Sequence, residues 1–522
     1  MGMVAPRQRI ASAFVVVCGQ YGDVRRYAAE RGICRQAVYR ESARVLAALD
    51  TTGWRTQICA LQQELRQACQ RVSELEARLA QAVVLDRDKQ AEVACVAQAI
   101  GISLPEVYTL LDTLRPGGIA SVATLGRWTK AAGAQASAVL AVLDEPTRSR
   151  VRQVAADEIY VRDPVLMVVE PESLCWVSGR LAKSVTGKAW AEQLRSLPLL
   201  EQVTRDGGTA LANGVATVQA QRRALEQPVP ADQLDHFHTL RGGSQGVRKA
   251  ENRVRSALAE ADDAQAALDR RRRQGQSENG YRHKARDRWA KASQAMDTWQ
   301  QRDATWQKTK AALQLVTPDG DLNTRARAEA ILAETLPQLP DADFAKPKRM
   351  LQQPETLTYL DEVQRKLAAL PVPPEVRQAA VRQECLRRRP ELLQGEGAPA
   401  AALRGVLLVC AVILAKAGPV GQQAVQGVQA IFRNTWRASS LVECINSVLR
   451  MQQARHRKMS QGLLDLKRLY WNCHTFRTGR RRGKTPYEIL GVPWPENLRW
   501  WDLLKWSPEQ LRNKLSELEE PK

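Results

Sequence analysis

The chain has 522 residues, of which 44% are apolar, and this is long enough for roughly three or four domains with hydrophobic cores. Its 77 Lys and Arg against 56 Asp and Glu give a formal net charge of +21, which favours an extended polyanion as a partner. The ten cysteines include no Cys-x-x-Cys pair and no Cys/His cluster of zinc spacing, which argues against a disulfide framework and a structural zinc site.

The N-terminus and the apolar runs bear on where the protein is located. The N-terminus lacks the apolar core and cleavage pattern of a signal peptide. The longest apolar run, residues 405–415, has 11 residues, whereas a membrane span needs about 20. We therefore expect a cytoplasmic protein with no membrane partner.

The first 50 residues have the spacing of a helix-turn-helix domain. Residues 23–31 form an amphipathic pattern, Gly32 and Ile33 interrupt it, and residues 35–46 resume it. An ordinary helical hairpin is the alternative, and the net charge favours DNA binding. Four residues of the second helix are expected to contact base edges and phosphates in the major groove: Arg35, Gln36, Tyr39 and Arg40.

A coiled-coil helix is predicted within residues 51–88. Apolar or small residues recur there in alternating steps of three and four: Ile58, Leu61, Leu65, Ala68, Val72, Leu75, Leu79 and Ala82. This seam either joins two copies of the protein or packs against a neighbouring helix of the same chain.

Residues 89–150 predict a second helical unit. It has helices over residues 93–100 and 104–114, with residues 101–103 as the turn, and a further helical stretch over residues 121–143. Pro105 suits the first turn of a helix. A second DNA-binding unit and a plain helical spacer both agree with this pattern.

From Asp157 onward the pattern changes to strands. Two apolar strand-like segments end on Asp157 and Asp206, and Glu-Pro-Glu-Ser at 170–173 is a hairpin signal. The pattern predicts further strands at residues 166–169, 174–177, 200–204 and 234–240, with helices at residues 186–197 and 210–225.

This order of elements and a group of later motifs resemble those of DDE-type transposases of bacterial insertion sequences. The resemblance covers roughly residues 150–245 and 435–492. Its most specific parts are Ser439-Ser-Leu-Val-Glu443-Cys-Ile-Asn446, then His456-Arg-Lys, Tyr470-Trp-Asn-Cys-His474 and Lys484-Thr-Pro-Tyr-Glu. The Asp206-Gly-Gly turn and the segment Asp235-His-Phe-His238 are also similar to family counterparts.

The resemblance implies a helix-rich, mixed fold with an α/β ribonuclease-H-like core. That core would have a five-stranded mixed sheet and comprise residues 151–245 and 436–492. A large all-α insertion, residues 246–435, would interrupt it, and residues 493–522 would form a C-terminal helical tail. Helix-turn-helix units and the coiled coil would precede it.

The resemblance also makes Asp157, Asp206 and Glu443 the catalytic, metal-binding triad. Physical reasoning leads to the same residues, because two cations about 3.5 to 4 Å apart stabilise both oxygens of an in-line displacement at phosphorus. Hard divalent cations take oxygen ligands, so we expect two Mg²⁺ ions, with Mn²⁺ as a substitute. For each acid the alternative is an ordinary surface carboxylate.

Residues near the triad have expected supporting roles. Asn446 and Arg450 share a helix face with Glu443, so we expect Asn446 to orient Glu443 or DNA and Arg450 to contact a phosphate. His236 and His238 would share one face of a strand beside the site, where packing or DNA contact is favoured over metal binding. Asp235 is the alternative ligand if Asp206 is not one.

The predicted insertion begins with an antiparallel helical hairpin that turns at residues 275–280. Apolar residues that recur from Val247 to Leu268, most of them alanines or valines, predict a close seam between its helices. Arg270 to Arg273 lie at its tip, where they either grip phosphates or are simply solvated. Some DDE transposases use a tryptophan of such an insertion to stack on a flipped base. The candidates for this role, for which helix packing is the alternative, are Trp289, Trp299 and Trp306.

A basic stretch follows the glutamate helix and is expected to bind the DNA backbone. Its predicted contacts are Arg455, Arg457, Lys458, Arg480, Arg481, Arg482 and Lys484.

Together these features predict a transposase, acting as a dimer on double-stranded DNA in the bacterial cytoplasm near the nucleoid. It would bind the terminal inverted repeats of its element, hydrolyse the ends and join the 3′-hydroxyls to target DNA. The alternatives are an inactive, transposase-derived DNA-binding or regulatory protein and a metal-dependent nuclease without strand transfer.

Overall fold

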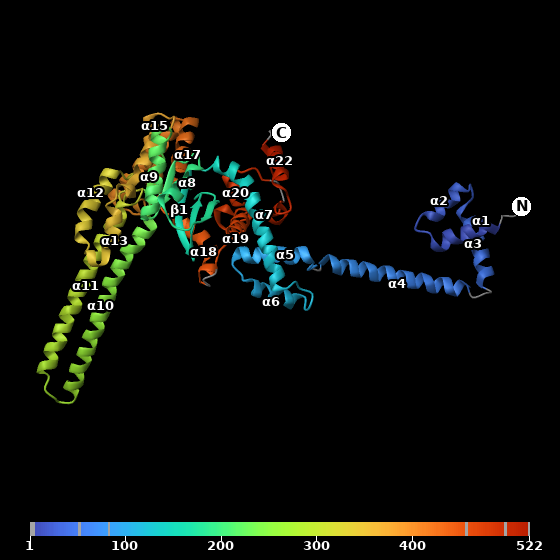
Figure 1. Ribbon diagram of the computed structural model, residues 1–522, viewed down its shortest axis with the longest axis horizontal. Coiled ribbons are helices and arrows are strands. Elements are labelled where there is room, and N and C mark those ends of the chain that lie inside the picture. The colour runs from blue at the N-terminus through green and yellow to red at the C-terminus, as the bar shows by residue number, and fades with distance from the viewer. Residues whose placement is uncertain (1–5, 51–53, 82–83, 455–457, 495–497, 520–522) are drawn as a thin grey trace. The chain divides into compact units, whose positions relative to one another are not determined.

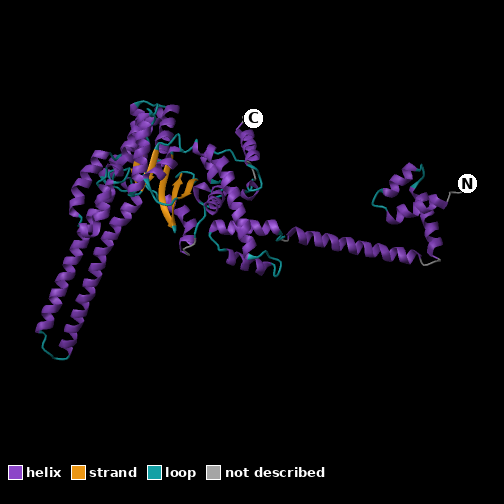
Figure 2. Ribbon diagram, in the orientation of Figure 1, coloured by secondary structure: helices purple, strands orange, loops and turns teal. Residues whose placement is uncertain are grey.

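The computed structural model describes residues 6–50, 54–81, 84–454, 458–494 and 498–519. The chain divides into two compact units, Met1–Asp86 and Arg87–Lys522. In the described residues both units are rich in helix, and the second unit contains a five-stranded sheet (Figure 2). The expectation of a helix-rich, mixed fold is therefore confirmed.

The first unit begins with three short helices that pack around a polar network. They are α1 (Pro6–Cys18), α2 (Asp23–Glu30) and α3 (Arg35–Asp50). Gly32, whose φ is +63°, makes the tight break between α2 and α3, as the sequence predicts. Glu41 on α3 accepts hydrogen bonds from Ser12 on α1 (2.5 Å) and from Arg31 (2.8 Å), so one carboxylate joins all three helices. The long helix α4 (Trp54–Gln81) follows.

The second unit is built on a mixed sheet with the strand order β3-β2-β1-β4-β5. Antiparallel pairing joins β1 to β2 and β2 to β3, whereas β4 pairs in parallel with β1 and with β5. The strands are β1 (Gln153–Val161), β2 (Asp163–Val169), β3 (Trp176–Leu181), β4 (Gln202–Arg205) and β5 (Ala231–Leu234).

Alternating residues of the strands bury the two faces of the sheet against different helices. Val154 and Ala156 of β1 pack toward α8 (Gly187–Arg195) and α9 (Thr209–Ala224). Ala155 and Ile159 instead lie in a cluster with Val442 of α18 (Ser440–Ala454). Because side chains alternate along a strand, Asp157 belongs to the face that α18 covers.

Two sequence predictions about the strands are wrong. Asp157 lies in the middle of β1 and not at the end of a strand. The fifth strand lies at residues 231–234 and not at the predicted residues 234–240, because the Asp235 side chain accepts hydrogen bonds from two backbone N–H groups and starts α10 (His236–Arg273). The helical insertion therefore begins ten residues earlier than residue 246.

The helices predicted between residues 89 and 150 are present, and they share a core with the C-terminal part of the chain. They are α5 (Arg87–Ile100), α6 (Leu104–Leu114) and α7 (Val122–Arg148). The core that α5 and α7 share with α19 (Gln461–Cys473) also includes residues of α20 (Pro486–Leu490), α21 (Trp500–Leu503) and α22 (Pro508–Glu519). The backbones of α7 and α19 approach closely at Gly133 and Gly462, where a Cβ on Gly133 would lie 2.8 Å from the Gly462 backbone.

The insertion begins with two long antiparallel helices, α10 and α11 (Asn279–Ala312), that lie side by side (Figure 1). Their buried seam includes Ala250, Val254, Ala261 and Leu268, as the repeat predicts. Six further α-helices share one large core: α12 (Arg325–Thr335), α13 (Asp341–Leu351), α14 (Thr358–Ala368), α15 (Pro374–Arg387), α16 (Ala398–Lys416) and α17 (Pro419–Arg433).

Helix α16 bears on the expectation that no membrane is involved. Among the described residues it is the one helix that is long and apolar enough to cross a membrane, and little of it is buried. A single helix of this kind is weak evidence for a membrane span, since helices of soluble proteins can meet the same criteria.

Candidate active site

The three predicted acids come from three different elements of the second unit. Asp157 lies on the central strand β1 and is 9% exposed. Asp206 follows the last residue of the neighbouring strand β4, whose register pairs Arg205 with Ala156. Glu443 lies in the first turn of α18, the helix that packs on the Asp157 face of the sheet.

Asp157 is the acid of the three whose pKa reflects the charges of the other two. Burial raises this pKa, the negative charges of Asp206 and Glu443 raise it further, and the result is a pKa of about 6. The charges of Asp206 on the sheet and of Glu443 on α18 therefore both reach the Asp157 carboxylate.

A buried ion pair holds the turn that carries Asp206. The Arg205 guanidinium donates from Nε and Nη2 to the two carboxylate oxygens of Asp232 on β5, at 2.7 and 2.9 Å. Its Nη1 donates to the Asp206 carbonyl at 3.1 Å. The Asp206 carboxylate itself accepts from the Gly208 N–H at 2.9 Å, so both the backbone and the side chain of Asp206 are oriented.

The residues predicted to assist Glu443 have partners other than those expected. Asn446 is buried, and its Nδ2 donates to Asp157 Oδ2 at 3.2 Å, so it orients Asp157 and not Glu443. Its Oδ1 has no hydrogen-bond partner among the described residues. The expected phosphate ligand Arg450 forms an ion pair with Glu443. Arg450 thus balances the charge of the acid that the prediction assigns to a metal.

Asp235 is a structural acid and not an alternative metal ligand. It is fully buried, and its carboxylate accepts from the N–H groups of Phe237 (2.9 Å) and His238 (3.1 Å) in the first turn of α10. It also accepts from the Ser439 N–H (3.0 Å), one residue before α18. One side chain therefore joins the start of the insertion to the start of the glutamate helix.

The two histidines have separate environments, contrary to the prediction of a shared strand face. His236 is buried, its Nε2 lies 2.8 Å from the Thr356 carbonyl, and burial lowers its pKa to about 4. His238 Nδ1 lies 2.5 Å from Asp235 Oδ2, and this hydrogen bond raises the pKa of His238, as do the charges of Asp157 and Asp206. Only His238 therefore faces the acidic site.

Glu158 is a fourth acid near the site, and the sequence reasoning missed it. Burial raises its pKa to about 7, and the charges of Asp206 and Asp157 contribute. Its Oε2 is buried without a partner among the described residues. Strand alternation would place Glu158 on the opposite face from Asp157. Because β4 ends at Arg205, however, the Glu158 carboxylate lies near the Asp206 turn, with Oε1 3.6 Å from where a Cβ on Gly208 would be.

The donor set suits a hard cation, although its arrangement is not that of a complete metal site. No group of three Asp, Glu, His or Cys side chains within the described part of the chain lies close enough to hold an ion. Asp157, Asp206 and Glu443 supply only oxygen donors, which Mg²⁺ prefers, and bound positive charge would relieve their repulsion. Glu443 would have to release Arg450 to join the two aspartates.

The four predicted DNA contacts of the helix-turn-helix segment share the exposed face of α3. Arg35, Gln36, Tyr39 and Arg40 are all exposed, whereas Val38 between them is completely buried. No described residue of the first unit covers this face, so a partner molecule can bind to it.

The predicted basic stretch is only partly described. Arg455 and Arg457 lie outside the described residues, as does His456 of the motif between them. Lys458, Arg482 and Lys484 are exposed.

Two other arginines of this stretch contact the protein itself. Arg481 donates to the carbonyls of Glu172 (2.7 Å) and Pro171 (2.9 Å) in the β2–β3 turn. The Arg480 guanidinium lies over the Trp436 ring, 5.8 Å from its centroid. Arg481 thus holds the hairpin turn, while Arg480 is otherwise exposed.

The three candidate tryptophans for base stacking differ in exposure. Trp289 is 42% exposed. Trp299 is partly buried, and its Nε1 is buried without a partner among the described residues. Trp306 is fully buried against Phe344 and against Gly243, where a Cβ would lie 2.1 Å from the ring. Trp306 therefore cannot stack on a base, and its proposed role is wrong.

This difference gives a stability prediction. Trp306→Ala will lower the free energy of unfolding by about 3 to 5 kcal/mol, because it leaves a cavity in the core of the insertion. Trp289→Ala will change it by no more than about 0.5 kcal/mol, because the ring is exposed. Urea denaturation of the two variants checks the difference, and equal effects would contradict the packing described here.

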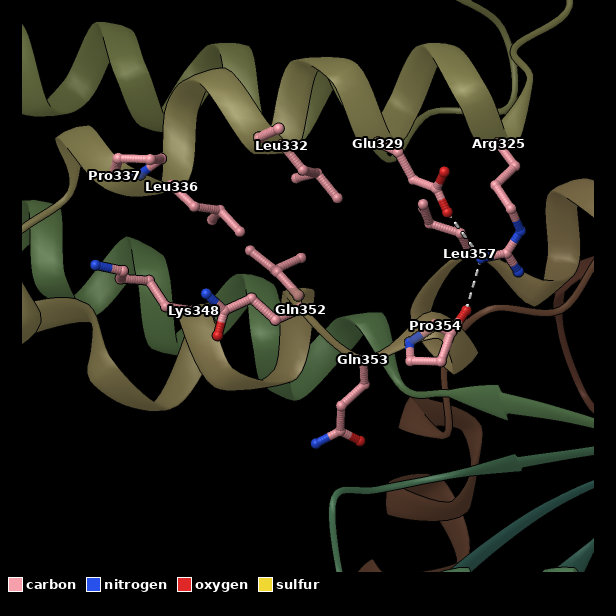
Figure 3. A pocket seen from close by; sticks show the side chains of 12 residues that line it. Arg325, Glu329, Leu332, Leu336, Pro337, Lys348, Gln352, Gln353, Pro354 and Leu357 are labelled. Atoms are coloured by element: carbon pink, nitrogen blue, oxygen red, sulfur yellow. Dashed lines mark hydrogen bonds and ion pairs between the residues drawn. The ribbon is translucent and has the colours of Figure 1, made fainter.

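A pocket of about 420 Å³ lies within the insertion, between α12, α13 and the turn that follows α13 (Figure 3). On one side Arg325 donates to the Pro354 carbonyl at 3.0 Å and pairs with Glu329 at 3.4 Å. Leu332, Leu336 and Leu357 supply much of its apolar lining, and none of the acids described above is among its lining residues. The pocket is therefore separate from the candidate active site.

Comparison with protein-family models, curated proteins and solved structures gives no match for this chain.

Proposed function

We propose that this protein is a DDE-type transposase. In this proposal it binds the terminal inverted repeats of an insertion sequence, cleaves the element ends by metal-dependent phosphodiester hydrolysis and joins the 3′-hydroxyls to target DNA. Its sheet, with α8 and α9 on one face and α18 on the other, is the proposed ribonuclease-H-like core. The observation that carries the proposal is the buried Asp157 on the central strand, whose pKa is raised by both Asp206 and Glu443.

In the proposed reaction, Asp157, Asp206 and Glu443 hold the metal. Two Mg²⁺ or Mn²⁺ ions bound there would stabilise the attacking and leaving oxygens of each displacement. Asn446 orients Asp157 through its 3.2 Å hydrogen bond, and Arg205 orients the Asp206 turn. Arg450 neutralises Glu443 until substrate and metal bind, and it then becomes free to contact a phosphate.

His238 is the proposed cationic group of the site. Asp235 keeps the imidazole in place and favours its protonated form, and the nearby charges of Asp157 and Asp206 act in the same direction. A protonated imidazole there would attract the phosphate that approaches the two aspartates. Glu158, with its unpaired Oε2, is a further oxygen donor close to Asp206.

DNA would be held by groups outside the catalytic centre. The exposed face of α3 is proposed to read the inverted repeats. Lys458, Arg480, Arg482 and Lys484 are proposed to contact the backbone, which makes binding dependent on salt. We also propose that the protein acts on DNA as a homodimer.

A cleavage assay tests the proposal. Wild-type protein with DNA that carries the element ends should cut it in Mg²⁺ or Mn²⁺ and not in EDTA. Glu443→Gln should lower the cleavage rate by at least about 10⁴-fold, because the three acids act as a unit, with DNA affinity unchanged. Unchanged cleavage by Glu443→Gln would exclude this glutamate as catalytic. Inverted repeats and a short target duplication beside the coding region would support a mobile element.

A specific observation favours a second candidate, an inactive relative that only binds DNA. Glu443 is paired with Arg450, and the described residues contain no three-ligand group. This candidate predicts DNA binding without cleavage in Mg²⁺ or Mn²⁺. Cleavage without joined products would instead identify a nuclease that lacks strand transfer.

A further inference from the structure

Helix α4 presents an apolar stripe that nothing covers within its own unit. Leu61, Leu65, Val72 and Leu75 are each more than half exposed. An amphipathic helix normally buries its apolar stripe against another element, and an exposed apolar patch of this kind marks an interaction site. The described residues of the first unit therefore lack an occupant for this surface.

The spacing of the stripe is that of a two-stranded coiled coil. In a heptad labelled a to g, Leu65 and Val72 occupy a positions, and Leu61, Ala68 and Leu75 occupy d positions. Leu79 and Ala82 would continue this pattern. The structure does not describe the Leu79 side chain or residue Ala82.

The start of α4 is already in contact with α1. Gln62 Nε2 donates to the Val17 carbonyl of α1 at 2.6 Å, and Ile58 is only partly exposed. The free seam therefore begins at Leu61 and runs away from the helix-turn-helix segment. A partner helix would fit along this outer part of α4.

Charges beside the seam favour a second copy of α4 in parallel orientation. Arg71 is at a g position and Glu76 is at the following e position. Pairing in parallel and in register sets Arg71 of each copy against Glu76 of the other, which gives two opposite-charge pairs. An antiparallel arrangement that sets Leu65 against Leu75 would also give two opposite-charge pairs, between Glu64 and Arg78, but it would place Arg71 against Arg71. The parallel arrangement has no such repulsion.

We propose that α4 forms a parallel, in-register, two-stranded coiled coil with α4 of a second copy, and that this dimer exists without DNA. Both α1–α3 segments would then lie at the same end of the coiled coil. The exposed faces of the two α3 helices would engage two sites at once, either on one DNA or on two. The dimer does not depend on the proposed cleavage chemistry, so it stands or fails separately.

A charge-reversal experiment on the full-length protein tests the pairing. Sedimentation equilibrium without DNA should show a reversible dimer. Arg71→Glu should raise the dissociation constant of the dimer about tenfold, because two attractive pairs become repulsive. The double variant Arg71→Glu/Glu76→Arg should return it to the wild-type value. Failure of this rescue would overturn the proposed register.

Replacing leucines of the seam with serine tests the apolar contact. The side chains of Leu65 and Leu75 are exposed, so the fold of the first unit does not depend on them. Leu65→Ser/Leu75→Ser should raise the dissociation constant about a hundredfold or more, since four buried leucines are lost per dimer. The matched control, Gln63→Ser/Gln70→Ser on the opposite face, should leave it unchanged. A monomer at all concentrations, or a dimer that ignores the seam variants, would refute the proposal.

A cysteine cross-link tests orientation. Ala68→Cys would be placed in a chain with Cys59→Ser and Cys69→Ser, which remove the exposed thiols of α4. Mild oxidation should give a disulfide-linked dimer, because d positions of parallel partners face each other. The parent without Ala68→Cys should not give this product. A dimer that does not cross-link would exclude the parallel orientation.

Discussion

Asp157→Asn will abolish cleavage and, in metal-free protein, will raise the free energy of unfolding at neutral pH. We expect a loss of at least about 10⁴-fold in cleavage rate, because removing one member of a catalytic group that acts as a unit removes most of its effect. The stability gain follows from the raised pKa of Asp157, which changes from 3.8 to about 6 on folding. That shift corresponds to about 2 to 3 kcal/mol.

The pH dependence of this gain has a defined sign. A carboxyl whose folded pKa is raised stabilises the protein only while it is protonated, so wild-type stability falls as the pH rises from about 4 through 6. The neutral amide does not have this cost. Urea unfolding of both proteins in EDTA should therefore agree below about pH 4 and should diverge above it in favour of Asp157→Asn.

Cation binding supplies the complementary measurement. Mg²⁺ or Mn²⁺ should raise the melting temperature of the wild type and should have little effect on Asp157→Asn. Glu192→Gln is the matched control, because Glu192 is an acid of the same unit that pairs with Arg180 on the surface, and it should cleave and respond to cations like the wild type. An Asp157→Asn protein that cleaves DNA, or that is less stable than the wild type at pH 7, would refute the assignment.

Asp232→Ala will destabilise the protein by about 3 to 5 kcal/mol, because it leaves a buried guanidinium without its counter-charge. The Arg205 and Asp232 side chains are only 5% and 14% exposed, and Arg205 also holds the Asp206 carbonyl. The same variant should slow cleavage, since the turn that carries Asp206 loses its support. Urea denaturation measures the first effect and the DNA assay measures the second.

Two further variants distinguish the loss of the Arg205–Asp232 ion pair from non-specific destabilisation of the fold. Burial raises the pKa of Asp232 even beside Arg205, which shows that removing the two charges from water is unfavourable. Replacing both with apolar residues, as in Arg205→Met/Asp232→Leu, should therefore recover most of the lost stability. That double variant should not recover cleavage if Arg205 positions Asp206. The control is Glu201→Ala, which breaks the more exposed pair with Arg152 and should cost no more than about 1 kcal/mol. If Asp232→Ala destabilised the protein no more than Glu201→Ala does, the Arg205–Asp232 pair would not be the buried pair proposed.

Many elements were predictable because their signals are local. Gly32 marks the break between α2 and α3, and the capping box formed by Ser103 and Glu106, with Pro105 between them, starts α6 at Leu104. The turn of the α10–α11 hairpin and its alanine-rich seam also follow from spacing alone. In each case the residues that decide the structure lie within a few positions of the element.

The errors have both local and distant origins. The sequence predicts a strand over residues 234–240, but the Asp235 carboxylate caps α10 two and three residues on and also binds the distant Ser439 N–H. Trp306 was a candidate for stacking until Phe344 and Gly243 proved to cover it. Spacing also does not show that helices within residues 89–150 share a core with α19.

The sequence by itself determined the helix-rich composition, the first four strands in order, the heptad seam of α4 and the choice of Asp157, Asp206 and Glu443 as candidate acids. Periodicity, capping residues and turn residues act over a few positions, so they can be read without a fold. Only the tertiary structure decided that Asn446 binds Asp157, that Arg450 pairs with Glu443 and that Glu158 approaches the Asp206 turn. Asn446 and Asp157 are 289 residues apart in the chain, and only folding brings such atoms together. The pairing of Arg450 with Glu443 depends on side-chain conformation, which spacing along the helix does not decide.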